Sequence, residues 1–278
     1  MTEVDVRVSP QWLRLREPAD AAARSRELVR GLVHGPVGGA TRVVHDLGCG
    51  SGSMGRWLAP LLEGPQHWVL HDRDPELLAL AAQDLPSAAA DGAAVTVETR
   101  HGDLTRLRPQ DLAGASLVTA SALLDMLTVD ELESFVRCSW EAACPSLVTL
   151  SVSGRVELTP TDPLDQVFGT AFNSHQRRTA LGRTLLGPDA VGHAVEQFRS
   201  LGAQVTTRSS PWRLDVRTGS LATEWLDGWV GAACLQRPAL TVAGAGYLSR
   251  RRTQLEEGRL GITVHHLDLL ARPPGAGR

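Results

Sequence analysis

Residues 45–52 read HDLGCGSG. They end a short run rich in β-branched residues, TRVVHDL (41–47), and lead directly into an amphipathic segment, SMGRWLAPLL (53–62). The first run predicts a strand and the second a helix. Glycines at the junction let the chain turn sharply and bring backbone N–H groups close to a ligand. The sequence therefore predicts a strand, a ligand-binding loop and a helix in direct succession.

The same alternation of strand and helix continues along the chain. Further strands are predicted at 67–72, 95–100, 115–120, 146–154, 203–210 and 261–271, and further helices at 75–85, 127–143, 187–202 and 221–235. Because repeated strand–helix units connect through right-handed crossovers, they predict a doubly wound α/β fold with a seven-stranded, mostly parallel sheet. Ligands bind such sheets at the carboxyl ends of the strands.

Two segments lie outside this alternation. Residues 12–34 predict an N-terminal helix with Pro18 in its first turn. Residues 154–187 carry few periodic signals and predict a helical or irregular insertion after the fifth strand. The whole chain is a single predicted domain, 1–278, with four parts: an N-terminal helical cap (1–41), a cofactor-binding half (42–153), an acceptor-cap insertion (154–200) and C-terminal strands and helix (201–278).

The charge of the chain disfavours a nucleic-acid partner. The formal net charge is −3, and all 28 cationic side chains are arginines. A dedicated nucleic-acid binder usually carries a basic domain or stripe. The one dense cluster, Arg250 to Arg252, is soon followed by Glu256 and Glu257 and predicts a solvated helix face. The abundance of Arg, Ala, Gly and Val is typical of a GC-rich bacterium.

The chain carries no sequence signal for a membrane span, secretion or a metal site. No apolar run reaches the roughly 18 residues that span a bilayer, and the first ten residues resemble neither a signal peptide nor a lipidation site. We therefore expect no membrane partner and a cytoplasmic protein. The four cysteines are scattered without zinc-site spacing, so no metal is predicted.

Three acids follow the first three predicted strands. Asp46 precedes the glycines and can pair with a cationic group, whereas a pyrophosphate would be repelled there. Asp72 ends the second strand, where a carboxylate can accept both hydroxyls of a ribose. Asp103 follows the third strand and can accept from an adenine amino group. Each acid has a structural alternative: Asp46 could be a helix-capping or structural acid, and Asp103 could cap a turn. For the ribose contact, Asp74, the natural N-cap before Pro75, competes with Asp72.

Gly50, Gly52 and Gly55 also satisfy Gly-x-Gly-x-x-Gly, with Asp72 at the distance that a dinucleotide fingerprint requires. A lone match to this pattern is weak evidence. Asp46 before the first glycine favours a ligand with an ammonium group over a nicotinamide dinucleotide. A nicotinamide-dependent oxidoreductase remains the alternative, and a parallel last strand would favour it.

The segments 46–52 (DLGCGSG), 72–78 (DRDPELL) and 102–104 (GDL) resemble, in order and spacing, the successive motifs of class I, Rossmann-like S-adenosylmethionine-dependent methyltransferases. The resemblance covers about 42–153. It implies S-adenosylmethionine as cofactor, S-adenosylhomocysteine as product and an antiparallel last strand at 261–271. The implied cofactor-binding residues are Asp46, Gly48, Cys49, Gly50, Gly52, Asp72, Arg73, Asp103, Leu104, Ala120 and Ser121.

The acceptor side of the site is less clearly marked. In related small-molecule enzymes, an insertion after strand five and an N-terminal helix cover the acceptor. His175 is the only histidine of residues 154–187 and a candidate base, with Asp125 after strand four as another. Arg177, Arg178 and Trp12 are candidate substrate-binding residues.

Other residues on the acceptor side have mainly structural readings. Trp12, Trp212, Trp225 and Trp229 are expected mainly to pack. His265 and His266 are adjacent in the last strand, so at most one is expected to face the core-facing layer.

The function expected from the sequence is direct methyl transfer to a small-molecule acceptor, with a homodimer as one option. Three alternatives stay open: an RNA methyltransferase, a protein that binds the cofactor without transferring methyl, and the oxidoreductase. The sequence does not decide which acceptor is used, whether O, N or C is methylated, or whether a base takes part.

Overall fold

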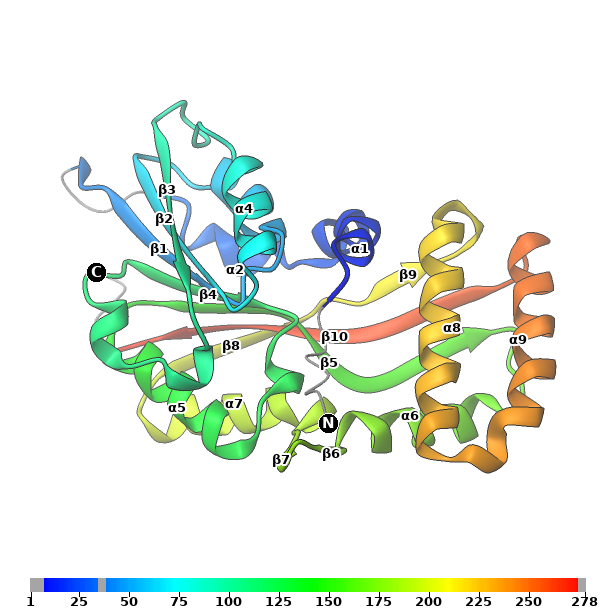
Figure 1. Ribbon diagram of the computed structural model, residues 1–278. Helices are drawn as coiled ribbons and strands as arrows, with labels where there is room; N and C mark the ends of the chain where they lie inside the picture. The colour runs from blue at the N-terminus through cyan, green and yellow to red at the C-terminus, as the bar shows by residue number, and fades with distance from the viewer. Residues whose placement is uncertain (1–7, 35–38, 275–278) are drawn as a thin grey trace.

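The computed structural model describes residues 8–34 and 39–274. It contains a mostly parallel sheet with helices on both faces (Figure 1). Its seven main strands lie in the order β3-β2-β1-β4-β5-β10-β8, and a short strand, β9, adds to β10. The first five pair in parallel, while β10 runs antiparallel to both β5 and β8. The predicted fold class and the reversed last strand are confirmed.

The strands of the main sheet are β1 Arg42–Leu47, β2 Gln66–Asp72, β3 Val95–His101, β4 Leu117–Ser121, β5 Ser146–Thr159, β8 Gln204–Ser209, β9 Trp212–Leu214 and β10 Gly261–Arg272. The two short strands β6 Thr179–Ala180 and β7 Arg183–Thr184 form a separate hairpin. The helices are α1 Pro10–Ala23, α2 Arg26–Arg30, α3 Ser53–Leu58, α4 Pro75–Gln83, α5 Val129–Glu141, α6 Asp165–Gln176, α7 Ala190–Ser200, α8 Gly219–Gln236 and α9 Thr241–Glu256.

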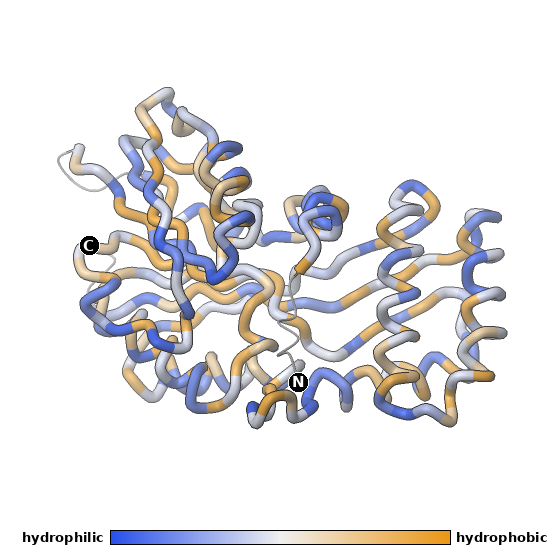
Figure 2. The backbone as a smooth tube through the Cα atoms, viewed as in Figure 1, coloured by the Kyte–Doolittle hydropathy of each residue, from blue (hydrophilic) through white to orange (hydrophobic). Residues whose placement is uncertain are grey.

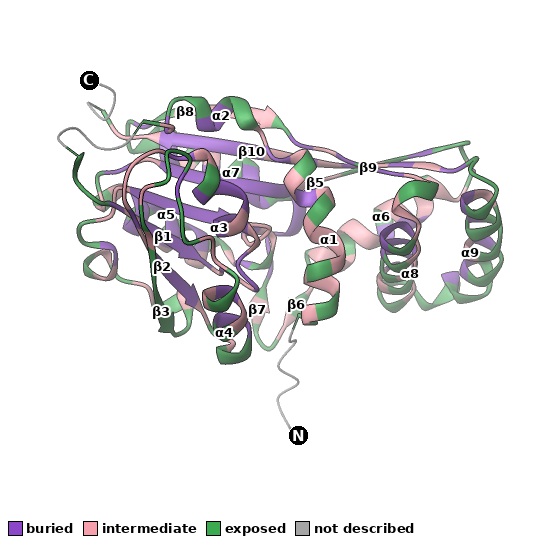
Figure 3. Cartoon of the chain, turned by 90° about the horizontal axis from the view of Figure 1, so that it is seen from above, coloured by how far each residue is buried: buried purple, intermediate pink, exposed green. Residues whose placement is uncertain are grey.

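Apolar side chains cover both faces of the sheet. One core cluster joins α2, α3 and α4 to the sheet, and a second joins α5 and α7 to the opposite face. Hydrophobic residues follow the central strands in Figure 2, and buried residues follow β1 and β10 in Figure 3. The edge strand β3 is mostly exposed. Within residues 8–34 and 39–274, no helix is long and apolar enough to cross a membrane.

The N-terminal helical segment is broken where one helix was predicted. Ser9 caps α1, so Pro18 lies inside this helix rather than in its first turn. The chain leaves the helical conformation at Arg24 and begins α2 after the N-cap Ser25, whose N–H donates to the buried carboxylate of Asp268 (2.7 Å). This break turns the Arg24 side chain toward the glycine loop.

A helical lobe extends the sheet beyond its regular part. β5 and β10 pair along almost their whole lengths and continue past the other strands toward α6, α8 and α9 (Figure 1). A third core cluster fills this lobe, and Phe168, Trp229 and Tyr247 form its centre.

Two lobe helices, α6 and α9, lack a clear sequence signal. α6 contains Gly, Thr, Asn and Ser, which are weak helix formers, and it is stabilised by packing against α8. In α9, a Cβ at Gly244 would come within 3.1 Å of Cys234 Sγ, so glycine there permits the close approach of α8. Both helices therefore depend on tertiary contacts that composition does not reveal.

The expectation that Arg250 to Arg252 form a solvated face is wrong for Arg251. Its guanidinium is fully buried and donates to Pro160 O (2.6 Å), to Gln254 Oε1 and to Asp165. Asp165 also accepts from Tyr247 Oη (2.6 Å). This network fixes α9 to the start of α6, because a buried arginine requires such partners.

Candidate functional site

The glycine loop, residues 48–52, joins β1 to α3, and hydrogen bonds to the end of β2 hold it in place. Cys49 N–H donates to His71 O (3.0 Å), and Gly50 N–H donates to Asp72 Oδ2 (2.8 Å). Gly48, Gly50 and Gly52 all have positive φ. A Cβ at Gly52 would also lie 2.9 Å from Ala81 Cα, so the tight turn requires glycine there.

Asp46 lies under this loop and is almost fully buried. Thr119 Oγ1 donates to its Oδ1 (2.7 Å), while Oδ2 has no partner among the described residues. Burial raises the pKa of Asp46 to about 6, and the Thr119 hydrogen bond and the nearby Arg24 oppose this rise. An unpaired buried carboxylate oxygen is a fitting acceptor for a ligand ammonium.

The other two acids hold different positions. Asp72 ends β2, half-buried, and its two oxygens accept from Gly50 N–H and Asp74 N–H (3.0 Å), so it orders the loop while keeping lone pairs for a ligand. Asp74 caps α4 by accepting from Glu76 and Leu77 N–H. Asp103 is exposed and accepts from Thr105 N–H (2.9 Å) at the start of a 3₁₀ turn.

The remaining predicted cofactor residues surround the same loop. Arg73 is exposed next to Asp72, and Leu104 follows Asp103. A Cβ at Gly48 would contact Leu123 (3.0 Å) and Leu104 (3.5 Å), so these two side chains adjoin the loop. The thiol of Cys49 is buried, and this burial raises its pKa well above the ordinary value, which keeps it protonated.

Arg24 was not predicted and lies in this site. Its guanidinium is buried and donates to Ser53 Oγ (2.9 Å) at the start of α3 and to Ser121 Oγ (3.0 Å) at the end of β4. Its Nε has no partner in the described structure. Arg24 and Asp46 could thus hold the carboxylate and ammonium of an amino acid, and the glycine loop and Asp72 could hold the nucleoside of S-adenosylmethionine. No sequence signal marks Arg24, because the helix break that aims it depends on Asp268.

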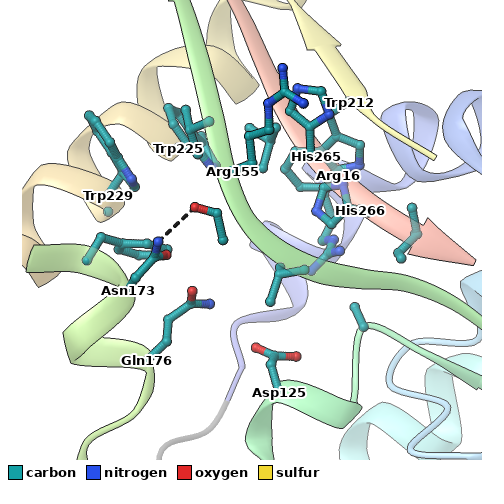
Figure 4. Close-up of a pocket in the computed structure, with 18 of the residues that line it drawn as sticks. Arg16, Asp125, Arg155, Asn173, Gln176, Trp212, Trp225, Trp229, His265 and His266 are labelled. Atoms are coloured by element: carbon teal, nitrogen blue, oxygen red, sulfur yellow. Dashed lines mark hydrogen bonds between the residues drawn. The ribbon is translucent and has the colours of Figure 1, made fainter. Parts of the chain in front are cut away.

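A cavity of about 370 Å³ lies beside this site, between the sheet and the helical lobe (Figure 4). Its walls come from α1, the turn after β4, β5, α6, β9, α8 and β10. The aromatic rings that line it are Trp12, Phe172, Trp212, Trp225 and Trp229. The tryptophans were expected mainly to pack; they pack in the lobe core and also line this cavity.

Asp125 is the predicted candidate that points into this cavity (Figure 4). It lies on the 3₁₀ turn Leu124–Met126, directly after β4. Desolvation raises the pKa of Asp125 to about 6, against the opposing effect of the nearby charges of Arg16 and Arg178. At neutral pH the group is therefore mainly a carboxylate that readily accepts a proton.

The other acceptor-side predictions fall in different places. Trp12 lines the cavity from α1. His175, Arg177 and Arg178 lie at the end of α6 and are not among the residues that line it. Arg177 pairs with Asp189 (2.7 Å), and Arg178 donates to His175 O (3.1 Å). Burial and the charge of Arg178 lower the pKa of His175.

The histidine pair of β10 keeps the expected alternation of burial, because only His266 is buried. Both His265 and His266 line the cavity. The register irregularity opposite them places the extra residues on β5, and burial still alternates along β10: His265 is half-buried and lies 3.4 Å from Glu157, whereas His266 is buried. His266 is buried against Trp212, and this burial lowers the pKa of His266 to about 3, so it is neutral.

Comparison with known proteins agrees with this arrangement. A family model described as a methyltransferase domain matches residues 44–145, from within β1 to the loop before β5. Among curated proteins, none matches the chain.

Solved structures share the fold at low identity. The cyclopropane-fatty-acyl-phospholipid synthase-like protein from Lactobacillus casei is 15% identical, with 95% of this chain and 92% of that chain covered and a TM-score of 0.55. Mycolic acid cyclopropane synthase CmaA1, complexed with SAH and CTAB, is 13% identical, with 94% of each chain covered and a TM-score of 0.51.

A parallel last strand would have favoured a nicotinamide-dependent oxidoreductase. Because β10 runs antiparallel to β5, the sheet gives that alternative no support. The matched domain, its glycine loop and the sheet order agree on one family. Residues 44–145 are therefore a methyltransferase domain, and the fold, the glycine loop and the unpaired oxygen of Asp46 agree with a class I, Rossmann-like enzyme that uses S-adenosylmethionine.

Proposed function

We propose that this enzyme transfers the methyl group to a small-molecule acceptor bound in the cavity, with Asp125 as general base. The observation that carries the proposal is the position of Asp125. It follows β4, at the carboxyl edge where the cofactor half binds its ligand, and its carboxylate faces an aromatic cavity.

The size and lining of the cavity support a small molecule over RNA. A volume of about 370 Å³ lies within the range of small-molecule sites. Its walls are mostly aromatic and aliphatic, with a few polar groups, which is the usual composition of such sites. A nucleic-acid substrate instead calls for a basic surface along the backbone.

The proposed division of the chain follows from the same walls. α1 supplies Trp12, and the insertion 154–200 supplies Phe172 and Asn173 from α6. α8, in the C-terminal part, supplies Trp225 and Trp229. We therefore propose that the acceptor cap consists of α1, the insertion 154–200 and α8.

S-adenosylmethionine supplies a methyl carbon that its sulfonium already activates. Asp125 Oδ would accept the acceptor's proton as the acceptor takes this methyl group, and the sulfur would leave as the neutral thioether of S-adenosylhomocysteine. Positioning provides much of the acceleration in such a displacement. His175 remains a competing candidate for the base, and Arg177 and Arg178 remain candidate contacts for an anionic part of the acceptor.

A side chain that fills the cavity is expected to reduce turnover strongly without changing the affinity for the cofactor. Gly228 lies on α8 in the cavity wall, and a Cβ there would meet open space. Gly228→Leu should therefore fold and reduce methyl transfer to an acceptor panel by at least about tenfold, measured with radiolabelled cofactor, while calorimetric affinity for S-adenosylhomocysteine stays unchanged. The matched control is Gly231→Leu, on the same helix, also facing open space and outside the wall. Equal turnover in both variants would contradict the proposal.

A further inference from the structure

The charges that line the cavity are unequally balanced. Arg16 and Arg155 are its two arginines, and each already has an acid outside the wall. Arg16 Nε donates to Asp20 Oδ2 (2.9 Å), and Arg155 pairs with Glu157. The positive charge of the lining is therefore compensated within the protein.

The two lining carboxylates, Asp125 and Glu224, have no such partner. Neither forms an ion pair in the described part of the chain, and Arg16 and Arg178 act on Asp125 only as nearby charges. Together with the paired arginines, this leaves the cavity with a net negative charge. A concave site whose unpaired charges have one sign concentrates ligands of the opposite sign.

The surroundings of Glu224 are aromatic. Glu224 and Gly228 are four residues apart on α8, as are Trp225 and Trp229, and all four line the cavity. The indoles of Trp225 and Trp229 stack with centroids 5.3 Å apart and an interplanar angle of 17°. Phe172 adds a third ring, 6.5 Å from Trp229. A carboxylate beside aromatic faces is the arrangement that binds organic ammonium groups.

We propose that the acceptor carries a cationic nitrogen, which binds between Glu224 and the rings of Trp225 and Trp229. This inference rests on the proposed function, because it assigns the class of molecule that the cavity holds. The methylated atom then lies at the other wall, near Asp125. Gly228 leaves the space in which the ammonium group fits against α8.

An anionic acceptor fits this wall less well. It would face the free carboxylates of Asp125 and Glu224, and it would have to compete with Glu157 for Arg155. A purely apolar acceptor would leave both carboxylates unpaired on binding, which costs free energy. Charge therefore separates the three classes of acceptor experimentally.

The test compares three probes of similar size: benzyltrimethylammonium, benzyl alcohol and phenylacetate. Binding is followed by quenching of tryptophan fluorescence in the presence of S-adenosylhomocysteine. The ammonium should bind about tenfold more tightly than the alcohol and more tightly still than the acid. Added salt should weaken only the ammonium, since Glu224 is exposed to solvent.

Glu224→Gln should weaken the ammonium about five- to tenfold and leave benzyl alcohol unchanged. The matched control is Asp227→Asn, which makes the same charge change on α8 but removes a carboxylate that pairs with Arg252 outside the cavity wall. Equal affinities for the ammonium and the acid, no ammonium binding at millimolar concentration, or equal loss in both variants would each overturn the inference.

The two proposals fail by different readouts. If the three probes bind without a charge preference but Gly228→Leu still lowers turnover, the proposal of a cationic acceptor is wrong and the proposal of the acceptor cavity stands. Turnover that survives Gly228→Leu removes the acceptor cavity itself.

Discussion

Asp125→Asn is expected to reduce methyl transfer by about 10²- to 10⁴-fold, the usual contribution of a general base. The cavity volume and the cofactor site should stay unchanged, since asparagine has nearly the same shape. Cofactor affinity, measured by calorimetry, should therefore match that of the wild type. His175→Ala is the parallel test of the other candidate base: a larger loss there than in Asp125→Asn would exchange the two roles.

The pH profile gives an independent check of Asp125. Because desolvation raises its pKa to about 6, kcat/KM of the wild type should rise with pH through about 6 and level off above 7. Asp125→Asn should lack this rise. An unchanged profile in the variant would show that another group titrates.

Stability should change in the opposite direction to activity. The folded-state pKa of Asp125 lies above the ordinary 3.8, so its contribution to stability is complete below pH 3.8 and is lost as the pH rises through about 6. At neutral pH the buried charge therefore weakens the fold. Asp125→Asn should raise the melting temperature at pH 7 and have less effect at pH 4, measured by thermal unfolding.

Asp72→Ala should abolish measurable binding of S-adenosylmethionine while the protein stays folded. The variant removes the proposed ribose acceptor and the carboxylate that orders Gly50 N–H. The expected loss exceeds about 100-fold by calorimetry. Circular dichroism checks the fold.

Asp74→Ala is the matched control for Asp72. Asp74 caps α4 two residues away, so its loss should cost about 1 kcal/mol of stability with little change in cofactor affinity. If Asp72→Ala weakened binding less than threefold, the loss would be under about 1 kcal/mol and the ribose assignment would be wrong.

The sheet and the loop were predictable because their signals are local. The strand TRVVHDL, the glycines after it and the N-cap Asp74 have conformational preferences that can be read from neighbouring residues alone. The structure has β1, the loop and α4 at those positions. The direction of β10 came from the family resemblance rather than from its residues. Such elements form from short-range preferences that the full fold reinforces.

The acceptor side was harder to predict because its residues meet only through tertiary structure. Arg16 and Glu224 line one cavity from α1 and α8, which are about 200 residues apart in the chain. His175 is the only histidine of residues 154–187 and was therefore a candidate base, yet it lies on the last turn of α6 and is not among the residues of the cavity wall. The register irregularity on β5 opposite His265 is likewise a property of the β5–β10 pairing.

A crystal structure with bound S-adenosylhomocysteine would decide whether the cofactor site opens into the cavity that contains Asp125. The product's sulfur should lie at the carboxyl end of β4, beside Ala122, and face the cavity toward Asp125. Its amino-acid end should contact Arg24 and Asp46. A sulfur that opens away from this cavity, with Asp125 on the far side of a protein wall, would contradict the assignment of the acceptor site.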